Sequence, residues 1–269
     1  MANRIAATFD KLRARGDKAL IPYIMAGDPS LAETESLVTA LEQAGADLIE
    51  LGVPFSDPIA DGPVIQKAAE RSLRSGVSLS SILSTVKTLR LKTQIPLILM
   101  TYYNTIMAMG EKEFCRKAVE AGVDGVIVPD MPPEEAEALG EAASAAKGPV
   151  VIFLLAPTST KSRQAQVIKR TTGFIYYVSL TGITGAKLVD LENVRQNVST
   201  IRKATPKPIA VGFGISTPQD AKAIADFADG IIVGSALVRQ IAEHQQDSTL
   251  IERISRFTRD LKTAMLNGK

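Results

Sequence analysis

Two residue types that form covalent and metal cross-links are almost absent from this sequence. It contains one cysteine, Cys115, and one histidine, His244, among 269 residues. A single cysteine cannot form a disulfide within the chain, and one histidine with one cysteine cannot supply the usual ligands of a zinc site. A chain of this length removes about three-quarters of its unfolded surface from water, so its core needs neither kind of cross-link.

Long apolar runs and an excess of one charge are also missing. The longest purely apolar run, Val150 to Ala156, is far shorter than the about 18 residues of a membrane span. Lysine and arginine number 31 against 29 acidic residues, a net charge of +2, which gives no electrostatic footprint for nucleic acid or an anionic membrane. The first 20 residues lack an apolar segment, so we expect an amphipathic helix there and no signal peptide. We expect no nucleic-acid partner, no membrane and a cytoplasmic location, with the plastid stroma as the alternative for a photosynthetic eukaryotic source.

Short runs rich in Ile, Val and Leu recur along the chain, each followed by a stretch of helical period. They lack the strict alternation of a one-sided antiparallel sheet, which favours buried parallel strands. Their spacing of about 30 residues is that of one βα unit. Eight units predict an α/β fold, a closed (β/α)8 TIM barrel of one domain over residues 1–269, with a doubly wound open sheet as the alternative. The runs are 20–25, 48–53, 96–102, 125–129, 150–155, 174–179, 209–214 and 230–234.

The helical stretches include two additions to the eight units. One is the N-terminal helix, and the other is an inserted helix after the second strand, where the stretches 64–75 and 78–90 both fit. Residues 251–266 read as a closing amphipathic helix. Helix starts are indicated at 28–30, 78–80, 132–135 and 216–218, and left-handed helix ends at Gly45, Gly76 and Gly122.

Glu50 is a carboxylate inside the apolar stretch DLIELGVP. We expect this segment to be buried, where an unpaired charge costs several kcal/mol. Period two places Leu48, Glu50 and Gly52 on one face, which puts Glu50 near the top of the barrel interior if that face points inward. Burial raises the pKa of a carboxyl, which suits a group that gives and takes a proton near neutral pH. The alternative is a core glutamate paired with a cation.

The loop PFSDPIADGP, residues 54–63, presents two more carboxylates about one strand end away from Glu50. Its three prolines stiffen it, while Gly62 permits a sharp turn. Asp57 and Asp61 either contribute to a Mg²⁺ site, cap the following helix through Asx turns, or act on a substrate. The proline density favours function for Asp61, whereas for Asp57 the capping and functional interpretations are balanced.

Glycines follow three late strands, in SLTGITGAK, VGFGIST and VGSA. Backbone amides of such loops, with a helix N-terminus, form the anion site that barrels use for phosphate. The GFG of the second loop begins a dinucleotide fingerprint, but Thr217 occupies its third glycine position and excludes that interpretation. Because no phosphate loop ending in Gly-Lys-Ser/Thr occurs, nucleoside triphosphate chemistry is also excluded.

Apolar and aromatic side chains mark other strand ends. Each alone fits a core position, but as a set they predict a flat apolar pocket. Together with the phosphate site, this pocket predicts a substrate that carries a phosphate at one end and an apolar ring system at the other. No lysine lies in the eight runs to form a Schiff base, and a zinc aldolase would need more histidines, so acid–base catalysis by carboxylates without a metal remains. The set is Tyr23, Met100, Tyr102, Ile127, Leu154, Tyr176 and Phe213.

The stretch LIELGVPFSDPIADGPVIQKA resembles the signature of the tryptophan synthase alpha-subunit family. The resemblance continues through YYNTI, VPDMPPEE, TGITG, GFGIS and IIVGSALV, and so covers nearly the whole chain. It implies a barrel lyase of tryptophan biosynthesis that cleaves indole-3-glycerol phosphate into indole and glyceraldehyde 3-phosphate. It also implies no cofactor in this chain, and a pyridoxal-phosphate-dependent beta subunit that receives indole in an α2β2 heterotetramer.

The resemblance assigns roles by position. Glu50 matches the acid–base glutamate that protonates the indole carbon bearing the glycerol chain, and Asp61 matches the aspartate that accepts a hydrogen bond from the indole nitrogen. Tyr176 matches a further active-site tyrosine. Phosphate-binding positions are matched by Gly185, Gly214, Gly234 and Ser235, and pocket positions by Tyr23, Tyr102 and Phe213. Thr184 matches a threonine of the mobile loop that meets the loop of Pro54, Asp57 and Pro58, and Leu180 stands where some members carry arginine.

Two other functions stay open at this point. A stand-alone lyase that releases free indole would keep the same catalytic residues. A catalytically idle barrel that only activates its partner would have no reason to retain both Glu50 and Asp61.

Overall fold

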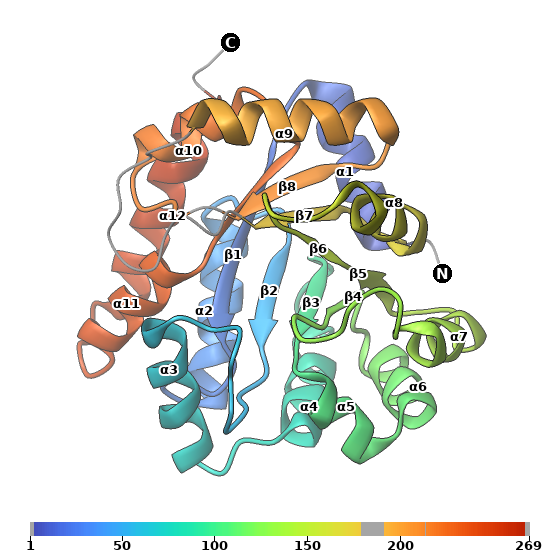
Figure 1. Cartoon of the computed structure of the whole chain (residues 1–269). Helices are drawn as coiled ribbons and strands as arrows, with labels where there is room; N and C mark the ends of the chain where they lie inside the picture. Colours follow the sequence, from blue (N-terminus) through green and yellow to red (C-terminus); the bar gives the residue numbers. More distant parts are fainter. Residues whose placement is uncertain (1–2, 179–190, 213, 267–269) are drawn as a thin grey trace.

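Parallel strands form the centre of the molecule (Figure 1). The computed structural model describes residues 3–178, 191–212 and 214–266. Within these residues nine strands pair side by side in the order β5-β4-β3-β2-β1-β9-β8-β7-β6. The strands are β1 Ala19–Met25, β2 Ile49–Gly52, β3 Leu97–Met100, β4 Gly125–Ile127, β5 Val150–Ile152, β6 Leu154–Leu155, β7 Ile175–Val178, β8 Ile209–Gly212 and β9 Gly230–Val233.

The two ends of this sheet belong to a single stretch of chain. The stretch 150–155, predicted as one strand, is divided at Phe153 into β5, which pairs with β4, and β6, which pairs with β7. Each half therefore bonds to a different neighbour, and together they connect the two ends of the sheet. The predicted TIM barrel is confirmed, with its fifth strand split.

Helices cover the outside of the barrel (Figure 1). None of the described helices is long and apolar enough to cross a bilayer. The helices are α1 Arg4–Arg15, α2 Leu31–Gln43, α3 Pro63–Arg74, α4 Leu79–Leu89, α5 Tyr103–Met109, α6 Glu111–Ala121, α7 Glu137–Ala145, α8 Lys161–Arg170, α9 Leu191–Ala204, α10 Pro218–Ala225, α11 Ser235–His244 and α12 Leu250–Leu266.

The predicted additions are confirmed, and a further one appears. Both α3 and α4 lie between β2 and β3, and α1 precedes β1. A second pair, α5 and α6, lies between β3 and β4 and is separated only by Gly110, whose φ of +86° ends the first of them. The helix expected to start within 132–135 begins instead at Glu137, because these residues form a turn in which Glu135 N–H donates to the Pro132 carbonyl at 3.0 Å.

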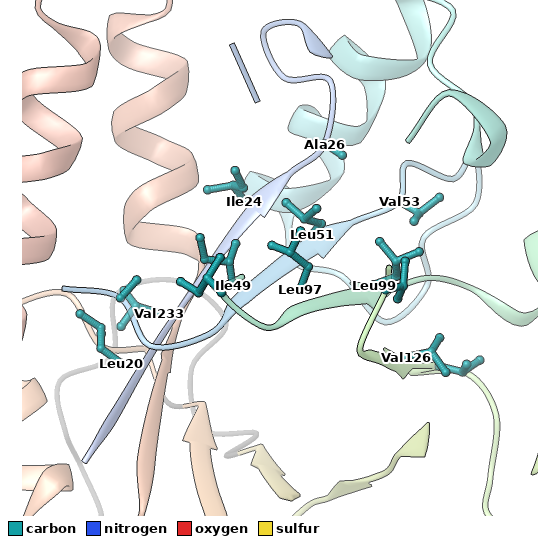
Figure 2. Close-up of a cluster of buried hydrophobic side chains, with 14 of the residues drawn as sticks. Leu20, Ile24, Ala26, Ile49, Leu51, Val53, Leu97, Leu99, Val126 and Val233 are labelled. Atoms are coloured by element: carbon teal, nitrogen blue, oxygen red, sulfur yellow. The ribbon is translucent and has the colours of Figure 1, made fainter. Parts of the chain in front are cut away.

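Alternate residues of each strand face two separate cores. Figure 2 shows the outward set, in which Leu20 and Ile24 of β1, Ile49 and Leu51 of β2, and Leu97 and Leu99 of β3 are buried under the helices. The intervening residues point into the barrel, where Ile21, Leu48 and Ile98 belong to a second cluster. The face that Glu50 shares with Leu48 therefore points into the barrel, which the sequence pattern alone had left open.

The N-terminal helix closes the bottom of the barrel. Ile5, Phe9 and Leu12 of α1 join the inner cluster, and the Phe9 ring lies 5.6 Å from that of Phe174. The helix is capped by Asn3, whose side chain accepts from the N–H of Ile5 at 3.0 Å. This apolar plug leaves the opposite, C-terminal end of the strands open for chemistry, as in other barrels of this type.

Four reciprocal hydrogen-bond pairs join neighbouring strands at the bottom of the barrel. In each, a residue one to three positions before a strand donates its backbone N–H to a carbonyl of an earlier strand, which is β5 for Thr172. The side-chain oxygen of the donating residue accepts the N–H of the residue that carries this carbonyl. Both bonds must break before the strands can slip, so the register is fixed at every second junction. The pairs, with N···O distances of 2.8–3.0 Å, are Asp47 with Leu20, Asp124 with Leu97, Thr172 with Val151 and Asp229 with Ile209.

Three of the four pairs also bind a cation from a neighbouring helix or its end. The aspartates thereby tie the outer layer of the molecule to the strands, whereas Thr172 brings no charge. The ion pairs are Asp47 with Lys262 at 2.6 Å, Asp124 with Arg90 at 2.5 Å and Arg4 at 2.9 Å, and Asp229 with Arg202 at 2.9 Å.

Candidate active site

Glu50 lies in the interior of the barrel, above the apolar inner cluster. Its Cα is in register with Tyr23 of β1 on one side and Ile98 of β3 on the other. The residue is 1% exposed, and neither carboxyl oxygen has a hydrogen-bond partner in the described part of the chain. Burial, and next the charge of Asp61, raise the pKa of Glu50 to about 8. Among the described residues no cation pairs with Glu50, so the structure does not support the alternative of a core glutamate in an ion pair.

Asp61 lies at the end of the loop between β2 and α3. Its backbone N–H donates to the Pro58 carbonyl at 3.0 Å, and its own carbonyl accepts from Nε2 of Gln66 at 2.9 Å. Burial raises the pKa of its half-buried carboxyl to about 6, against the lowering effect of the Tyr102 hydroxyl. Helix α3 begins at Pro63, and Gly62 at its N-cap position provides no side-chain cap, so neither Asp57 nor Asp61 caps it.

Tyr102 holds this loop against the end of β3. Its ring stacks on Phe55, with centroids 5.2 Å apart, and its hydroxyl accepts from the N–H of Ala60 at 2.9 Å. The loop is thus fixed near both of its ends by one buried side chain. The resemblance predicted a pocket-lining position for Tyr102, but nothing in the sequence indicated its contacts with Phe55 and with the backbone of Ala60.

The outer side of the same loop is exposed. Asp57 accepts a hydrogen bond from the Ser56 hydroxyl and lies in the solvent, while Pro54 is buried and Pro58 half-buried. Ile59 is 85% exposed. No group of three or more His, Cys, Asp or Glu side chains in the described ranges is arranged to hold a metal ion, so the loop carboxylates do not form such a group with Glu50.

Two tyrosines complete the interior around Glu50. Tyr23 of β1 and Tyr176 of β7 are phenols whose pKa is raised well above 10 by burial and by the negative charges of Asp61 and Glu50. Each lies over a glycine: a Cβ on Gly52 would lie 2.0 Å from the Tyr23 hydroxyl, and one on Gly212 would lie 2.6 Å from Cε2 of Tyr176. The carboxyls of Glu50 and Asp61 therefore both influence the two phenols electrostatically.

The described phosphate positions follow β8 and β9, the strands that come after β7 and lead round the barrel to β1. Gly234 follows β9 and precedes α11, which begins at Ser235, so the first N–H groups of that helix are at the C-terminal face of the barrel. Gly214 has a φ of +43°, and a Cβ there would meet nothing within 4 Å. Thr184, Gly185 and Phe213, together with Leu180, lie outside the described residues.

An ion pair between the segment after β1 and helix α3 was not predicted. Asp28, 2% exposed, follows β1 and accepts two hydrogen bonds from Arg71 of α3, at 2.8 and 2.7 Å. Next to it, the Ser72 hydroxyl donates to the Ala26 carbonyl at 2.7 Å. These bonds fix α3, and with it the loop of Asp61, to the strand that carries Tyr23. The sequence offers no signal for a pair 43 residues apart.

Residues 9–266 match the family model described as "Tryptophan synthase alpha chain". The chain belongs to this family. It is 50% identical to the tryptophan synthase alpha chain of Geobacter sp. (strain M21) over 266 residues, 99% of each chain. It is 53% identical to that of Geotalea daltonii over 257 residues, 93% of this chain and 97% of the relative. The solved tryptophan synthase subunit alpha of Legionella pneumophila str. Paris superposes with a TM-score of 0.93 at 39% identity, covering 99% of this chain and 100% of that one.

Membership of this family makes the protein an enzyme of tryptophan biosynthesis, a carbon–carbon lyase that cleaves indole-3-glycerol phosphate into indole and glyceraldehyde 3-phosphate. The alpha chain of this family carries no cofactor, because the pyridoxal phosphate belongs to the beta subunit that receives the indole. The family predicted from the sequence is confirmed.

Proposed function

We propose that Glu50 and Asp61 perform the cleavage together. Glu50, protonated at neutral pH, donates its proton to the ring carbon that bears the glycerol chain, and the positive charge spreads to the indole nitrogen. Asp61, as a carboxylate, accepts the N–H hydrogen bond and stabilises this cation. The carbon–carbon bond then breaks, its electron pair passes to the ring, and the hydroxyl proton of the departing carbon returns to the Glu50 carboxylate. The buried, unpartnered carboxyl of Glu50, with a pKa of about 8, is the observation that supports this assignment.

We infer that the remaining positions bind the two ends of the substrate. Tyr176 faces Glu50 across the barrel interior, and Tyr23, Tyr102 and Phe213 line the pocket. The phosphate is bound at the start of α11, where the N–H groups of a helix N-terminus favour an anion. Its binding positions are Gly185, Gly214, Gly234 and Ser235, while Thr184 belongs to the loop after the sixth strand of the barrel, which closes over the substrate.

A bell-shaped pH profile of kcat/KM is expected from these roles. Glu50 must be protonated to act as an acid, so activity falls above its pKa of about 8. Asp61 must be ionised to accept the N–H bond, so activity falls below its pKa of about 6. The profile of the isolated chain, measured from pH 5 to 9 by indole formation, checks both limbs. In Asp61→Asn the acidic limb should disappear, and the basic limb should remain but move to lower pH, because the charge of Asp61 no longer raises the pKa of Glu50. An unchanged acidic limb would contradict the role of Asp61.

We infer that the beta subunit docks at the mouth of the barrel, in an α2β2 assembly. Two large apolar side chains are exposed there, Ile59 in the loop after β2, 85% exposed, and Met107 on α5 after β3, 56% exposed. Pro58 and Asp57 belong to the same surface, and a groove beside them is lined by Phe55, Ser56, Asp57, Pro58, Ile59, Gln66, Glu70 and Leu73. Apolar residues grouped at the end of adjacent strands support a protein partner at this face.

We infer further that residues 1–269 form one domain and that the protein works in the cytoplasm. Helices from both ends of the chain pack on the same barrel: α1 fills its bottom, and Lys262 of α12 bonds to Asp47 beside β2. The single cysteine, buried on α6, suits a reducing compartment.

Indole release from indole-3-glycerol phosphate is expected to be slow for the chain alone and to accelerate when a beta subunit and serine are added. Ile59, at the centre of the partner surface, belongs to the same loop as Asp61, so docking is expected to shift the position of the Asp61 carboxylate. The assay with and without the partner separates the alternatives: fast cleavage unaffected by the beta subunit would favour a stand-alone lyase. No cleavage in either condition would contradict the roles of Glu50 and Asp61.

A further inference from the structure

Tyr23 is a buried phenol that the mechanism above leaves without a chemical role. It points into the barrel from β1, is 6% exposed, and is the cross-strand neighbour of Glu50. Its hydroxyl lies over Gly52, where a Cβ would come within 2.0 Å of it. Since Gly52 and Glu50 lie on the same face of β2, two residues apart, the hydroxyl is one step from Glu50 toward the mouth.

The other end of the Tyr23 side chain lies against the proposed phosphate site. A Cβ on Gly234 would lie 3.5–3.7 Å from Cβ, Cγ and Cδ1 of Tyr23. Gly234 immediately precedes α11, whose N-terminus is the proposed anion site. The side chain therefore runs from the phosphate end of the site to the Glu50 end, which is the course that the glycerol chain of the substrate must take.

The Tyr23 hydroxyl is available as a hydrogen-bond donor. Among the described residues it forms no hydrogen bond, although Asp61 and Glu50 both act on it electrostatically. Both charges and its burial favour the protonated phenol at every pH at which the enzyme works. A donor held in this position faces oxygen atoms of the substrate between the ring and the phosphate.

We propose that Tyr23 is a further catalytic residue, whose O–H donates a hydrogen bond to the glycerol hydroxyl oxygen next to the indole ring. This inference rests on the proposed roles of Glu50 and the phosphate site. The bound oxygen becomes the aldehyde oxygen of glyceraldehyde 3-phosphate as its own proton passes to the Glu50 carboxylate and the carbon–carbon bond breaks. Tyr23 keeps its proton throughout and stabilises the negative charge that develops on this oxygen.

Tyr23→Phe tests the proposal, because it removes the donor and retains the ring against Gly234. We expect kcat for indole formation to fall by about 10- to 100-fold, the effect of losing one hydrogen bond to a developing charge. The second measurement is the Kd of indole-3-propyl phosphate, a substrate analogue without the glycerol hydroxyls. Because this analogue offers no oxygen to Tyr23, its affinity should change by less than about twofold. Tyr177→Phe is the matched control: its buried phenol lies on the outward face of β7, and both quantities should stay at the wild-type values.

The two measurements distinguish a hydrogen bond to the substrate from a packing role of Tyr23. A large fall in kcat with unchanged analogue affinity supports the hydrogen bond, and an unchanged kcat overturns it. A parallel loss of turnover and analogue affinity would show that Tyr23 only packs in the pocket, and would overturn it too. Failure of the proposed function is seen separately: full activity of Glu50→Gln would remove the acid–base mechanism irrespective of the behaviour of Tyr23→Phe.

Discussion

Glu50→Gln is expected to lower kcat for indole formation by about 10²- to 10⁴-fold, the usual contribution of general acid–base catalysis. Glutamine has nearly the same shape but cannot donate a proton to the ring carbon or accept one from the glycerol hydroxyl. The affinity for indole-3-propyl phosphate should stay close to that of the wild type, because the pocket around residue 50 keeps its volume. Steady-state kinetics of the isolated chain measure the first quantity and calorimetric titration the second.

The same substitution is expected to remove a loss of stability at high pH that the buried Glu50 carboxyl causes in the wild type. Glu50 has an ordinary pKa of 4.5 when unfolded and about 8 when folded, so the folded protein holds its proton more tightly. The wild type therefore loses stability as the pH rises from 4.5 to 8, by about 5 kcal/mol at about 1.4 kcal/mol for each tenfold change. Glu50→Gln removes this dependence, although a buried amide without partners costs about 1–3 kcal/mol at all pH values.

Urea denaturation at pH 5 and pH 8 measures this dependence directly. The free energy of unfolding of the wild type, relative to Glu50→Gln, should be smaller at pH 8 than at pH 5. Glu252→Gln, the same change at an exposed position of α12, should leave both kcat and the pH dependence unaltered. Equal pH dependence in wild type and Glu50→Gln would show that Glu50 titrates normally and is not the buried acid inferred here.

The sequence indicated Glu50 because a charge inside an apolar run has a cost that is visible without a structure. It indicated Asp61 for a similar reason, since the prolines around it restrict the loop. The spacing of the βα units predicted the barrel because each unit has a similar length, and the alternation in 48–52 predicted which side chains share a face. These signals are local, and each depends on residues within a few positions of one another.

Features that depend on closure of the barrel were not predictable in this way. The hydrogen bond from Ala60 N–H to the Tyr102 hydroxyl spans 42 residues, and the place of the Tyr23 hydroxyl over Gly52 depends on the register of β1 against β2. The split of the fifth strand at Phe153 depends on its pairing with two different neighbours. In each case the partners are determined by three-dimensional register, which no local pattern specifies.

The reciprocal pairs at the bottom of the barrel also could not be predicted from the sequence. Their members lie 20–27 residues apart, about one βα unit, so each aspartate reads in the sequence as an ordinary turn residue before a strand. Only the closed sheet brings its side chain to the N–H of the preceding strand. These pairs lie at the end of the barrel opposite Glu50, where stability and not catalysis is expected to depend on them.

Asp124→Asn is accordingly expected to lower the free energy of unfolding by about 3–5 kcal/mol, the cost of removing one partner of a buried ion pair. Asparagine can still accept the hydrogen bond that the Leu97 N–H donates at 2.8 Å, so the decrease in the free energy of unfolding reports the loss of the charge. It leaves the guanidinium of Arg90, whose side chain is 10% exposed, without its counter-ion, and Arg4 of the plugging helix loses the same partner. Urea denaturation at pH 7 measures the difference.

Thr172→Val is the matched comparison, because it removes the side-chain acceptor from the one pair that has no cation. Its expected cost is about 1–3 kcal/mol, that of leaving the N–H of Val151 without its 2.9 Å bond. Both variants should keep kcat within about twofold of the wild type at temperatures where they are folded, since neither touches the mouth of the barrel. An Asp124→Asn cost no larger than that of Thr172→Val would show that the cations add nothing to these pairs, and that the backbone and side-chain bonds alone hold the register.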